Sequence, residues 1–390
     1  MLIHFSGIYA TGFPILGLGT EAALLKEVKI LMSVKTNPGN YFEDFTLDKK
    51  IIHATPRTVT EGDVSLYTAL YGFRFPAQSS DEFARTMGFP RAPLEDFLAF
   101  HMVFGKTVPD VSLNAIANLG YAGGRFGVPV YPGDTVKTTS TVIGVKENSD
   151  AKTGTVYVRS VGVNQRDEMV LDYRRWVMVR KKDKGSLAPK AMVPDLPEAV
   201  SIEDFIIPEG ITNRGYDTDL ASSPHLWDDY EVGEKIDHVD AMTLEEADHM
   251  TATRLYQNTA KVHFNQHTEK DGRFGKRIIY GGHIISMARS LSFNGLANAF
   301  KVVAINGGRH VAPSFAGDTI YAWSQVVDKM ELPGRSDFGA LRLRTVAAKD
   351  QACDEFPYKI DKEDKDGKAK KVYHSAVVLD FDYTVLMPRR

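Results

Sequence analysis

Hydrophobic and polar residues alternate with a period of two in several segments of the chain. These segments are 136–142, 156–160 and 171–179 in the first half, and 341–345 and 377–385 in the second. Successive side chains of a strand point to opposite faces, so the pattern predicts strands with one buried face. No regular alternation of such strands with helices follows, which favours an antiparallel over a parallel sheet.

Two other segments carry the helical spacing i, i+3, i+4, i+7. The positions are Leu94, Phe97, Leu98 and His101 in one segment and Ile284, Met287, Ala288 and Leu291 in the other. Each helix is apolar enough to need covering on most of its surface, so each half is predicted as one antiparallel sheet curled around one helix. Thr60 and Thr243 are predicted as N-caps of shorter helices, because a hydroxyl can accept hydrogen bonds from free N–H groups.

The second half of the chain repeats the first at an offset of 185 residues. Phe42–Phe45 recurs as Trp227–Tyr230, Thr60–Asp63 as Glu245–Asp248, and Leu70-Tyr71 as Leu255-Tyr256. The Gly133-Asp134 turn recurs as Gly317-Asp318 at an offset of 184, so one residue has been lost between the halves; this turn signal has a structural explanation. Between Thr345 and Val377 the second half carries a charged insertion, predicted to be a solvated loop.

The repeat predicts the domain boundaries. Residues 37–182 form a first domain, 183–224 a linker rich in Pro, Ala and charge, and 225–390 a second domain. Residues 1–36 are interpreted as an N-terminal extension, either a mis-called start or a loosely attached tail.

Composition and charge narrow the class of protein. A length of 390 residues and 43% hydrophobic content allow two domains with real cores. A net charge of −3 offers no basic excess to neutralise a phosphate backbone, so nucleic acid is not expected as a partner. The single Cys353 excludes an intrachain disulfide and favours a reducing compartment, which predicts a cytoplasmic protein. No convincing membrane span is present in the sequence.

The two halves differ in chemistry at the same offset. His263 in the second half corresponds to Gln78 in the first, and Asn258 corresponds to Phe73. A general base must titrate near neutrality, which an imidazole does and a carboxamide does not. A catalytic site is therefore expected in the second half, with a degenerate motif in the first.

Four motifs carry a family resemblance. They are Ala69–Gly72 with Ser80–Phe83, Gly105–Asp110, Tyr256–Asn265, and Tyr280–His283 with Asn294–Ala297. With these motifs the chain resembles the MaoC-like hotdog hydratase superfamily and, within it, the mesaconyl-CoA hydratases. The resemblance implies an α+β double hotdog fold, an acyl-CoA tunnel, and reversible hydration of mesaconyl-CoA to β-methylmalyl-CoA without metal, flavin or nicotinamide.

The superfamily pattern Asp-x-Asn-Pro-x-His retains only its histidine here. Asn258 stands at the Asp position, Ala260 at the Asn, Lys261 at the Pro and His263 at the His. A carboxamide can orient a water but cannot take its proton. The hypothesis is that His263 alone acts as the base while Asn258 positions the water.

The resemblance also implies a backbone N–H donor to the thioester carbonyl, at Gly281 or Gly282. A fixed donor at a helix N-terminus suits developing negative charge. The plainer alternative is that the two glycines let the chain turn into the helix. His283 is expected either to cap this helix or to line the pocket.

The free carboxylate of the substrate calls for a cation near the reacting carbons. Lys261 is the first candidate, with Arg277, Arg254 and Arg91 as alternatives. A zinc site at His263, His267 and His283 is rejected, because no carboxylate or thiolate spacing accompanies these residues. The remaining histidines His53, His101, His238 and His374 are interpreted as surface or hydrogen-bonded core residues.

Other functions remain open at this point. They are hydration of another enoyl-CoA, acyl-CoA thioester hydrolysis, and a non-catalytic CoA-thioester-binding subunit. Because hotdog proteins commonly pair through sheet edges, a homodimer is expected.

Overall fold

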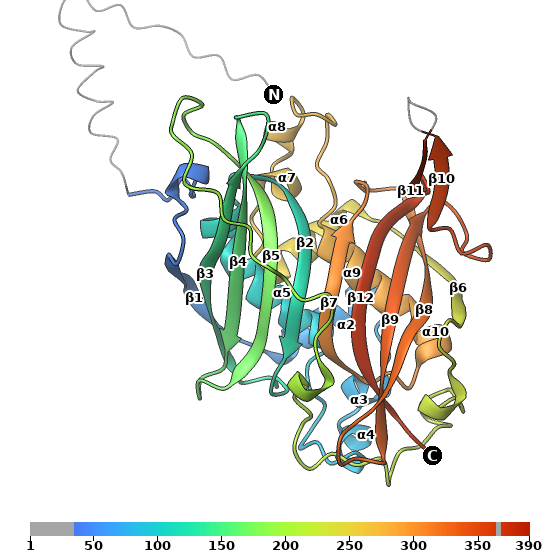
Figure 1. Cartoon of the computed structure of the whole chain (residues 1–390). Helices are drawn as coiled ribbons and strands as arrows, with labels where there is room; N and C mark the ends of the chain where they lie inside the picture. Colours follow the sequence, from blue (N-terminus) through green and yellow to red (C-terminus); the bar gives the residue numbers. More distant parts are fainter. Residues whose placement is uncertain (1–34, 364–367) are drawn as a thin grey trace, which may run out of the picture. The chain divides into compact units, whose positions relative to one another are not determined.

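The computed structural model describes residues 35–363 and 368–390, and residues Gly39–Arg390 form one compact unit. The interpretation of the N-terminal extension falls mainly on residues 1–34, which lie outside the described part of the chain. The elements named below belong to the compact unit, and Figure 1 shows their arrangement.

One ten-stranded antiparallel sheet runs through this unit. Its strands, in spatial order, are β1 (Lys50–Thr58), β3 (Thr135–Glu147), β4 (Thr153–Val163), β5 (Met169–Arg180), β2 (Ala115–Phe126), β7 (Lys301–His310), β12 (Val377–Pro388), β9 (Phe338–Lys349), β8 (Thr319–Glu331) and β6 (Lys235–Thr243). The first five strands come from the first half of the chain and the last five from the second. The two halves join where β2 pairs with β7, with Tyr121 opposite Gly308 and Arg125 opposite Ala304.

The helices lie mainly on one side of this sheet (Figure 1). They are α2 (Glu61–Tyr71), α3 (Pro76–Ser79), α4 (Asp81–Thr86), α5 (Asp96–Thr107), α6 (Glu246–Leu255), α7 (Lys261–Phe264), α8 (Gln266–Glu269), α9 (Gly281–Leu291) and α10 (Phe293–Leu296). Short helical turns are η1 (Phe42–Asp44), the π-helical η2 (Val108–Ser112), η3 (Ile202–Asp204) and η4 (Trp227–Asp229). All residues of α5 are buried, and so is α9 apart from Gly281. Each half is therefore a sheet around one long helix, as predicted.

Residues that match in the sequence repeat touch each other between the halves. The hydroxyls of Tyr71 and Tyr256 are 2.7 Å apart, and His101 Nε2 is 2.9 Å from Ser286 Oγ. Both pairs are separated by the repeat offset of 185 residues. The halves are thus related by an approximate two-fold axis that passes between α5 and α9.

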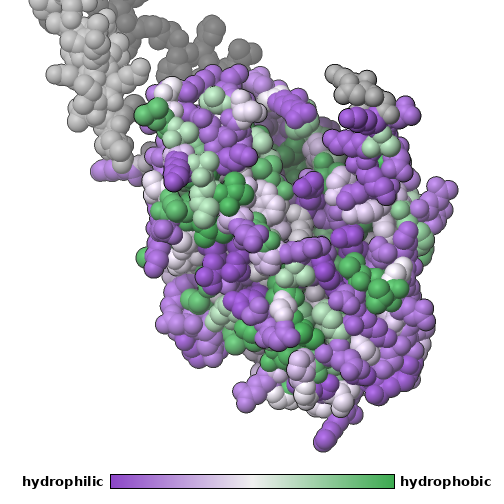
Figure 2. All heavy atoms as spheres, viewed as in Figure 1, coloured by the Kyte–Doolittle hydropathy of each residue, from purple (hydrophilic) through white to green (hydrophobic). Residues whose placement is uncertain are grey.

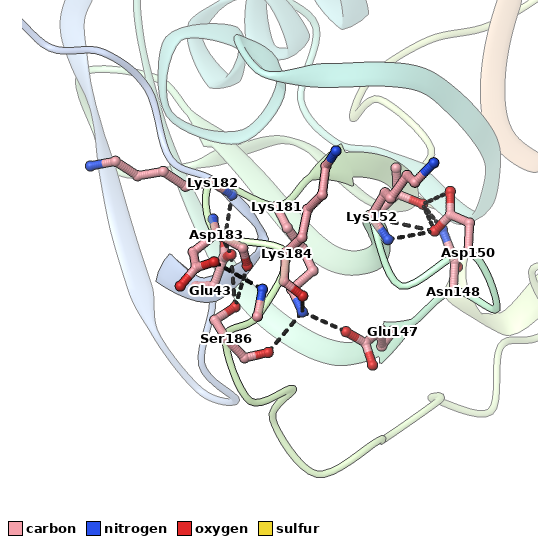
Figure 3. Close-up of polar contacts among 12 residues, drawn as sticks. Glu43, Glu147, Asn148, Asp150, Lys152, Lys181, Lys182, Asp183, Lys184 and Ser186 are labelled. Atoms are coloured by element: carbon pink, nitrogen blue, oxygen red, sulfur yellow. Dashed lines mark hydrogen bonds and ion pairs between the residues drawn. The ribbon is translucent and has the colours of Figure 1, made fainter.

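The linker between the halves is held against the sheet. At its start the Glu43 carboxylate accepts hydrogen bonds from the backbone N–H groups of Lys182 and Asp183, both at 3.1 Å (Figure 3). Further along, Met192 pairs with Val145 of β3, and the Val200 N–H donates to a side chain of β7. This connection is therefore a packed part of the unit.

The outer face of the sheet is polar. Figure 2 shows hydrophilic residues over most of the face seen in Figure 1, with hydrophobic residues in small patches between them. Asp172 of β5 accepts from Arg159 at 2.8 and 2.9 Å and from Arg125 at 3.1 Å. The apolar side of each strand consequently faces the helices, where the core lies.

Two local predictions need correction. Thr60 caps α2 as predicted, but α6 begins at Glu246 with Glu245 as its N-cap. Thr243 instead ends β6, because its hydroxyl is 3.0 Å from that of Thr319 on β8 and the strand pairing continues to this point. The insertion between Thr345 and Val377 is also more than a loop. It contains a two-stranded sheet of β10 (Lys359–Glu363) and β11 (Ala369–Tyr373).

Helix α5 approaches the second half closely at Gly105. A Cβ atom at this position would lie 1.7 Å from the carbonyl oxygen of Tyr256. We expect Gly105→Ala to lower the free energy of unfolding by about 3 kcal/mol, because the backbone must move to admit the methyl group. Gly62→Ala is the matched control, since its Cβ would meet Thr60 Oγ1 at an ordinary 3.5 Å. Equal denaturation midpoints for the two variants would contradict this packing.

Candidate active site

A cavity of about 560 Å³ opens between the two halves. The first half contributes Phe104 from α5, Asn118 from β2 and Arg175 from β5. The second half contributes the segment around His263, the start of α9 and His310 of β7. Neither half alone encloses this space.

His263 lies in α7 and is half-buried at the cavity wall. Its Nδ1 is 2.9 Å from the carbonyl oxygen of Ile278. A carbonyl can only accept, so Nδ1 carries the proton and Nε2 keeps the lone pair in the neutral ring. Burial lowers the pKa of His263 to about 4, although the bond to Ile278 acts in the opposite direction. At neutral pH the imidazole is therefore able to accept a proton.

Asn258 lines the same cavity and is 1% exposed. Its side-chain Oδ1 accepts a hydrogen bond from the backbone N–H of Ala260 at 3.2 Å. The backbone N–H of Asn258 donates to the Thr253 carbonyl. The preceding Gln257 has a φ of +56°, which makes the chain turn sharply after α6. After this turn, both Asn258 and His263 line the cavity.

The two glycines at the start of α9 have different surroundings. Gly281 lines the cavity, whereas Gly282 is buried and does not line it. A Cβ on Gly281 would lie 2.3 Å from the His310 ring, and one on Gly282 would lie 2.4 Å from Tyr280. Close packing therefore requires both glycines, and only the Gly281 backbone borders the space that a ligand would occupy.

The other predicted binding residues do not line the cavity. Lys261 and Arg254 are exposed, and Arg277 pairs with Glu246 on α6. His283 is buried, with Nδ1 2.7 Å from the Tyr71 hydroxyl, and burial lowers its pKa to about 3. Arg91, the further alternative, pairs with Glu61 at 2.5 Å.

Several residues that line the cavity, or that contact its lining, escaped the sequence analysis. His310 of β7 lies with its Nε2 3.1 Å from the Tyr121 hydroxyl, and burial lowers its pKa to about 4. His249 accepts a hydrogen bond from the Tyr280 N–H at 2.9 Å and so supports the start of α9. Arg175 is a charged residue at one of the alternating, otherwise mainly apolar positions of its strand. This exception to the pattern could have marked Arg175 as a candidate binding residue.

Some polar atoms at the cavity have no hydrogen-bond partner among the described residues. They are Nε and Nη1 of Arg175, both polar side-chain atoms of Asn118, and Ser314 Oγ. Buried polar groups are normally paired in proteins, so unpaired ones around a cavity are available to a ligand.

The corresponding place in the other half is filled. Phe73 and Phe75 are buried in the core, and Gln78 donates to the carbonyl oxygen of Phe300. The guanidinium of Arg289 lies 3.7 Å from the centre of the Phe75 ring. The degenerate motif of the first half thus serves packing.

Two further findings concern other kinds of site. Within the described ranges, no cluster of three or more His, Cys, Asp or Glu side chains could hold a metal ion. Among the same residues, no helix is long and apolar enough to span a membrane.

Solved structures share this architecture. A MaoC domain protein dehydratase from Chloroflexus aurantiacus has a TM-score of 0.87 and 66% identity, covering 92% of this chain and 100% of that one. A Mycobacterium tuberculosis protein with a double hotdog fold has a TM-score of 0.69 at 22% identity, covering 90% and 99%. This second likeness shows the fold alone. The chain is a MaoC-like double hotdog protein, which confirms the predicted fold class.

Sequence comparison then gives the family. The family model described as mesaconyl-CoA hydratase matches residues 27–357. Beta-methylmalyl-CoA dehydratase of Chloroflexus aurantiacus is 66% identical, covering 92% of this chain and 100% of the relative. Mesaconyl-CoA hydratase of Cereibacter sphaeroides is 56% identical, covering 91% and 100%. The chain belongs to the mesaconyl-CoA hydratase family and is an enzyme of the hydro-lyase type, which confirms the predicted resemblance.

The buried histidines predict how stability depends on pH. Burial lowers the pKa of seven of them, namely His53, His101, His238, His249, His263, His283 and His310. Below about pH 6.5 these histidines bind protons in the unfolded chain but not in the folded chain. Each of them therefore lowers the free energy of unfolding by about 1.4 kcal/mol for every pH unit of acidification. Glu95 has the opposite effect on the free energy of unfolding. Burial raises its pKa to about 7, so below that pH the folded chain holds a proton that the unfolded chain releases.

We therefore expect the free energy of unfolding to fall steeply between pH 7.5 and pH 5.5. Urea denaturation at a series of pH values measures this change. A free energy that stays level over that range would show that these histidines are protonated in the folded protein.

Proposed function

We propose that the protein catalyses reversible hydration of mesaconyl-CoA to β-methylmalyl-CoA, with His263 as the base. The observation that carries this assignment is the position of His263, whose unprotonated Nε2 belongs to a half-buried ring on a cavity wall. The names and identities of the relatives support the substrate.

In the hydration direction, a water is held near His263 Nε2 and the Asn258 carboxamide. His263 takes one proton from the water, and the oxygen forms a bond to the β-carbon of the enoyl thioester. The electron pair of the C=C bond moves toward the thioester oxygen, where the Gly281 N–H stabilises the negative charge. The imidazolium then returns the proton to the α-carbon, which completes the addition of one water. Dehydration follows the same steps in reverse.

A histidine with a pKa of about 4 is a weak base, and the substrate itself changes this. Mesaconyl-CoA brings a carboxylate into the cavity, and a nearby negative charge favours the imidazolium form. Binding of the substrate therefore raises the pKa of His263 toward the value that suits proton transfer near neutral pH.

The remaining parts of the proposal concern the enzyme as a whole. It works in the cytoplasm, uses no metal, flavin or nicotinamide, and forms a homodimer. Support for pairing comes from β1 and β6, the two edge strands of the sheet, which are exposed along much of their length. An uncovered strand edge can pair with another chain.

His263→Ala tests the base. We expect kcat/KM for mesaconyl-CoA to fall about 1,000-fold, because general base catalysis typically contributes this much. Loss of enoyl absorbance measures the reaction, and a thiol reagent tests for free CoA. The control is His267→Ala, which removes an exposed imidazole four residues away. Undiminished turnover in His263→Ala would refute the role of the base, and release of free thiol by the unmutated protein would identify a thioesterase.

Asn258→Ala tests the positioning of water. We expect kcat to fall about 10- to 100-fold with little change in KM, because the lost contact is to water and not to the thioester. Steady-state kinetics over a range of mesaconyl-CoA concentrations separates these constants. A rise in KM at constant kcat would instead make Asn258 a contact to the substrate.

A further inference from the structure

Arg175 stands out as a buried cation without a counter-charge. It is 1% exposed and lies on β5 in the first half of the chain. Its Nη2 donates to Thr107 Oγ1 at 2.7 Å and to Ser112 Oγ at 2.8 Å, while Nε and Nη1 have no partner among the described residues. Within that part of the chain, no ion pair joins Arg175 to a carboxylate.

Such an arrangement is costly unless a ligand completes it. A buried guanidinium loses its hydration, and its partners in the protein must replace that stabilisation. Two hydroxyl partners and the Phe104 ring, whose centre is 4.3 Å from the guanidinium carbon, compensate only in part.

The other deeply buried arginine provides a comparison. Arg289 is 2% exposed, and its Nε and Nη1 also lack hydrogen-bond partners among the described residues. Its Nε nevertheless forms an ion pair, 3.8 Å from Oε1 of Glu95, a carboxylate that is itself buried. In the repeat, Arg289 corresponds to Phe104. Arg175 corresponds to Tyr383, because Leu171-Asp172 on the same strand matches Leu379-Asp380. Arg289 thus has a carboxylate beside its guanidinium, whereas Arg175, which lines the cavity, has none among the described residues.

We propose that Arg175 binds the free carboxylate of the substrate and thereby selects a dicarboxylate-derived enoyl-CoA. The proposal rests on the proposed function and deepens it. In mesaconyl-CoA the carboxylate is bonded to the β-carbon, which is the atom that water attacks. The residue that binds this group must therefore lie in the same chamber as His263, and Arg175 lines that chamber.

Ring contacts define the path between the two residues. The rings of His263 and Tyr280 have centres 5.6 Å apart, and those of Tyr280 and Phe104 are also 5.6 Å apart. The Arg175 guanidinium in turn lies over the Phe104 ring. The unpaired Nε and Nη1 are neighbouring donors on one guanidinium, and a carboxylate accepts from such donors with both oxygens.

Arg175→Met tests this assignment. We expect kcat/KM for mesaconyl-CoA to fall at least 100-fold, because the carboxylate would then be buried without a partner. The comparison substrate is (E)-2-methylbut-2-enoyl-CoA, in which a methyl group replaces the carboxylate, and its turnover should stay level or rise. Replacing an unpaired buried charge by an apolar side chain of similar length should leave thermal stability equal or higher. Arg175→Lys, which keeps the charge and loses the planar pair of donors, should show an intermediate loss.

Arg174→Met is the matched control. Arg174 is the adjacent residue on β5 and bonds to Asp172 and the Gly123 carbonyl, outside the cavity. This variant should keep the ratio of kcat/KM values for the two substrates. An equal loss on both substrates in Arg175→Met, or no loss on mesaconyl-CoA, would overturn the proposal.

Binding of unreactive analogues separates this inference from the proposed function. Calorimetry would compare methylsuccinyl-CoA with 2-methylbutanoyl-CoA, which are saturated and cannot be hydrated. The unmutated protein should prefer the first, and Arg175→Met should lose this preference. If the unmutated protein does not hydrate mesaconyl-CoA, the proposed function fails, while the preference in binding still decides the role of Arg175.

Discussion

The packing of two long helices against each other is the constraint on which the rest of this structure depends. Helices α5 and α9 are buried almost completely, yet polar groups join them. The Tyr67 hydroxyl lies 3.0 Å from both Ser286 Oγ and Glu95 Oε2, and Tyr71 contacts both Tyr256 and a histidine of α9. Buried polar groups are costly when they lose their partners, so the two helices can pack in few relative positions. This register fixes the cavity, because its walls come from both sides of the helix pair.

Much of the fold could be predicted from the sequence, because its determinants are local and repeated. Alternation of apolar residues gave the strands, and the offset of 185 residues gave two equivalent halves that meet at Tyr71 and Tyr256. Thr243 was misplaced because a strand pairing across to Thr319 outweighed its preference as a cap. Such a pairing depends on residues far away in the sequence, where no local pattern reports it.

The candidate site could be predicted only in part, for a related reason. His263 and Gly281 were singled out because motifs surround them, and both line the cavity. Their catalytic roles remain proposals. Arg175 and His310 carry no motif, and their strands are brought to the cavity only when the two halves join. The predicted cations Lys261 and Arg254 lie close to His263 in the sequence, but both are exposed. Lys261 shares the short helix α7 with His263, where residues two apart face different directions, and Arg254 belongs to α6.

The approximate two-fold axis has a consequence for how selectivity can arise. In a symmetric dimer of single hotdog domains, any substitution appears twice, once in each equivalent chamber. Here one polypeptide holds both copies, so an arginine at position 175 does not oblige the matching position, Tyr383, to change. Fusion of the halves therefore permits division of labour, with proton transfer assigned to one copy and anion recognition to the other, while the second chamber is free to become solid core.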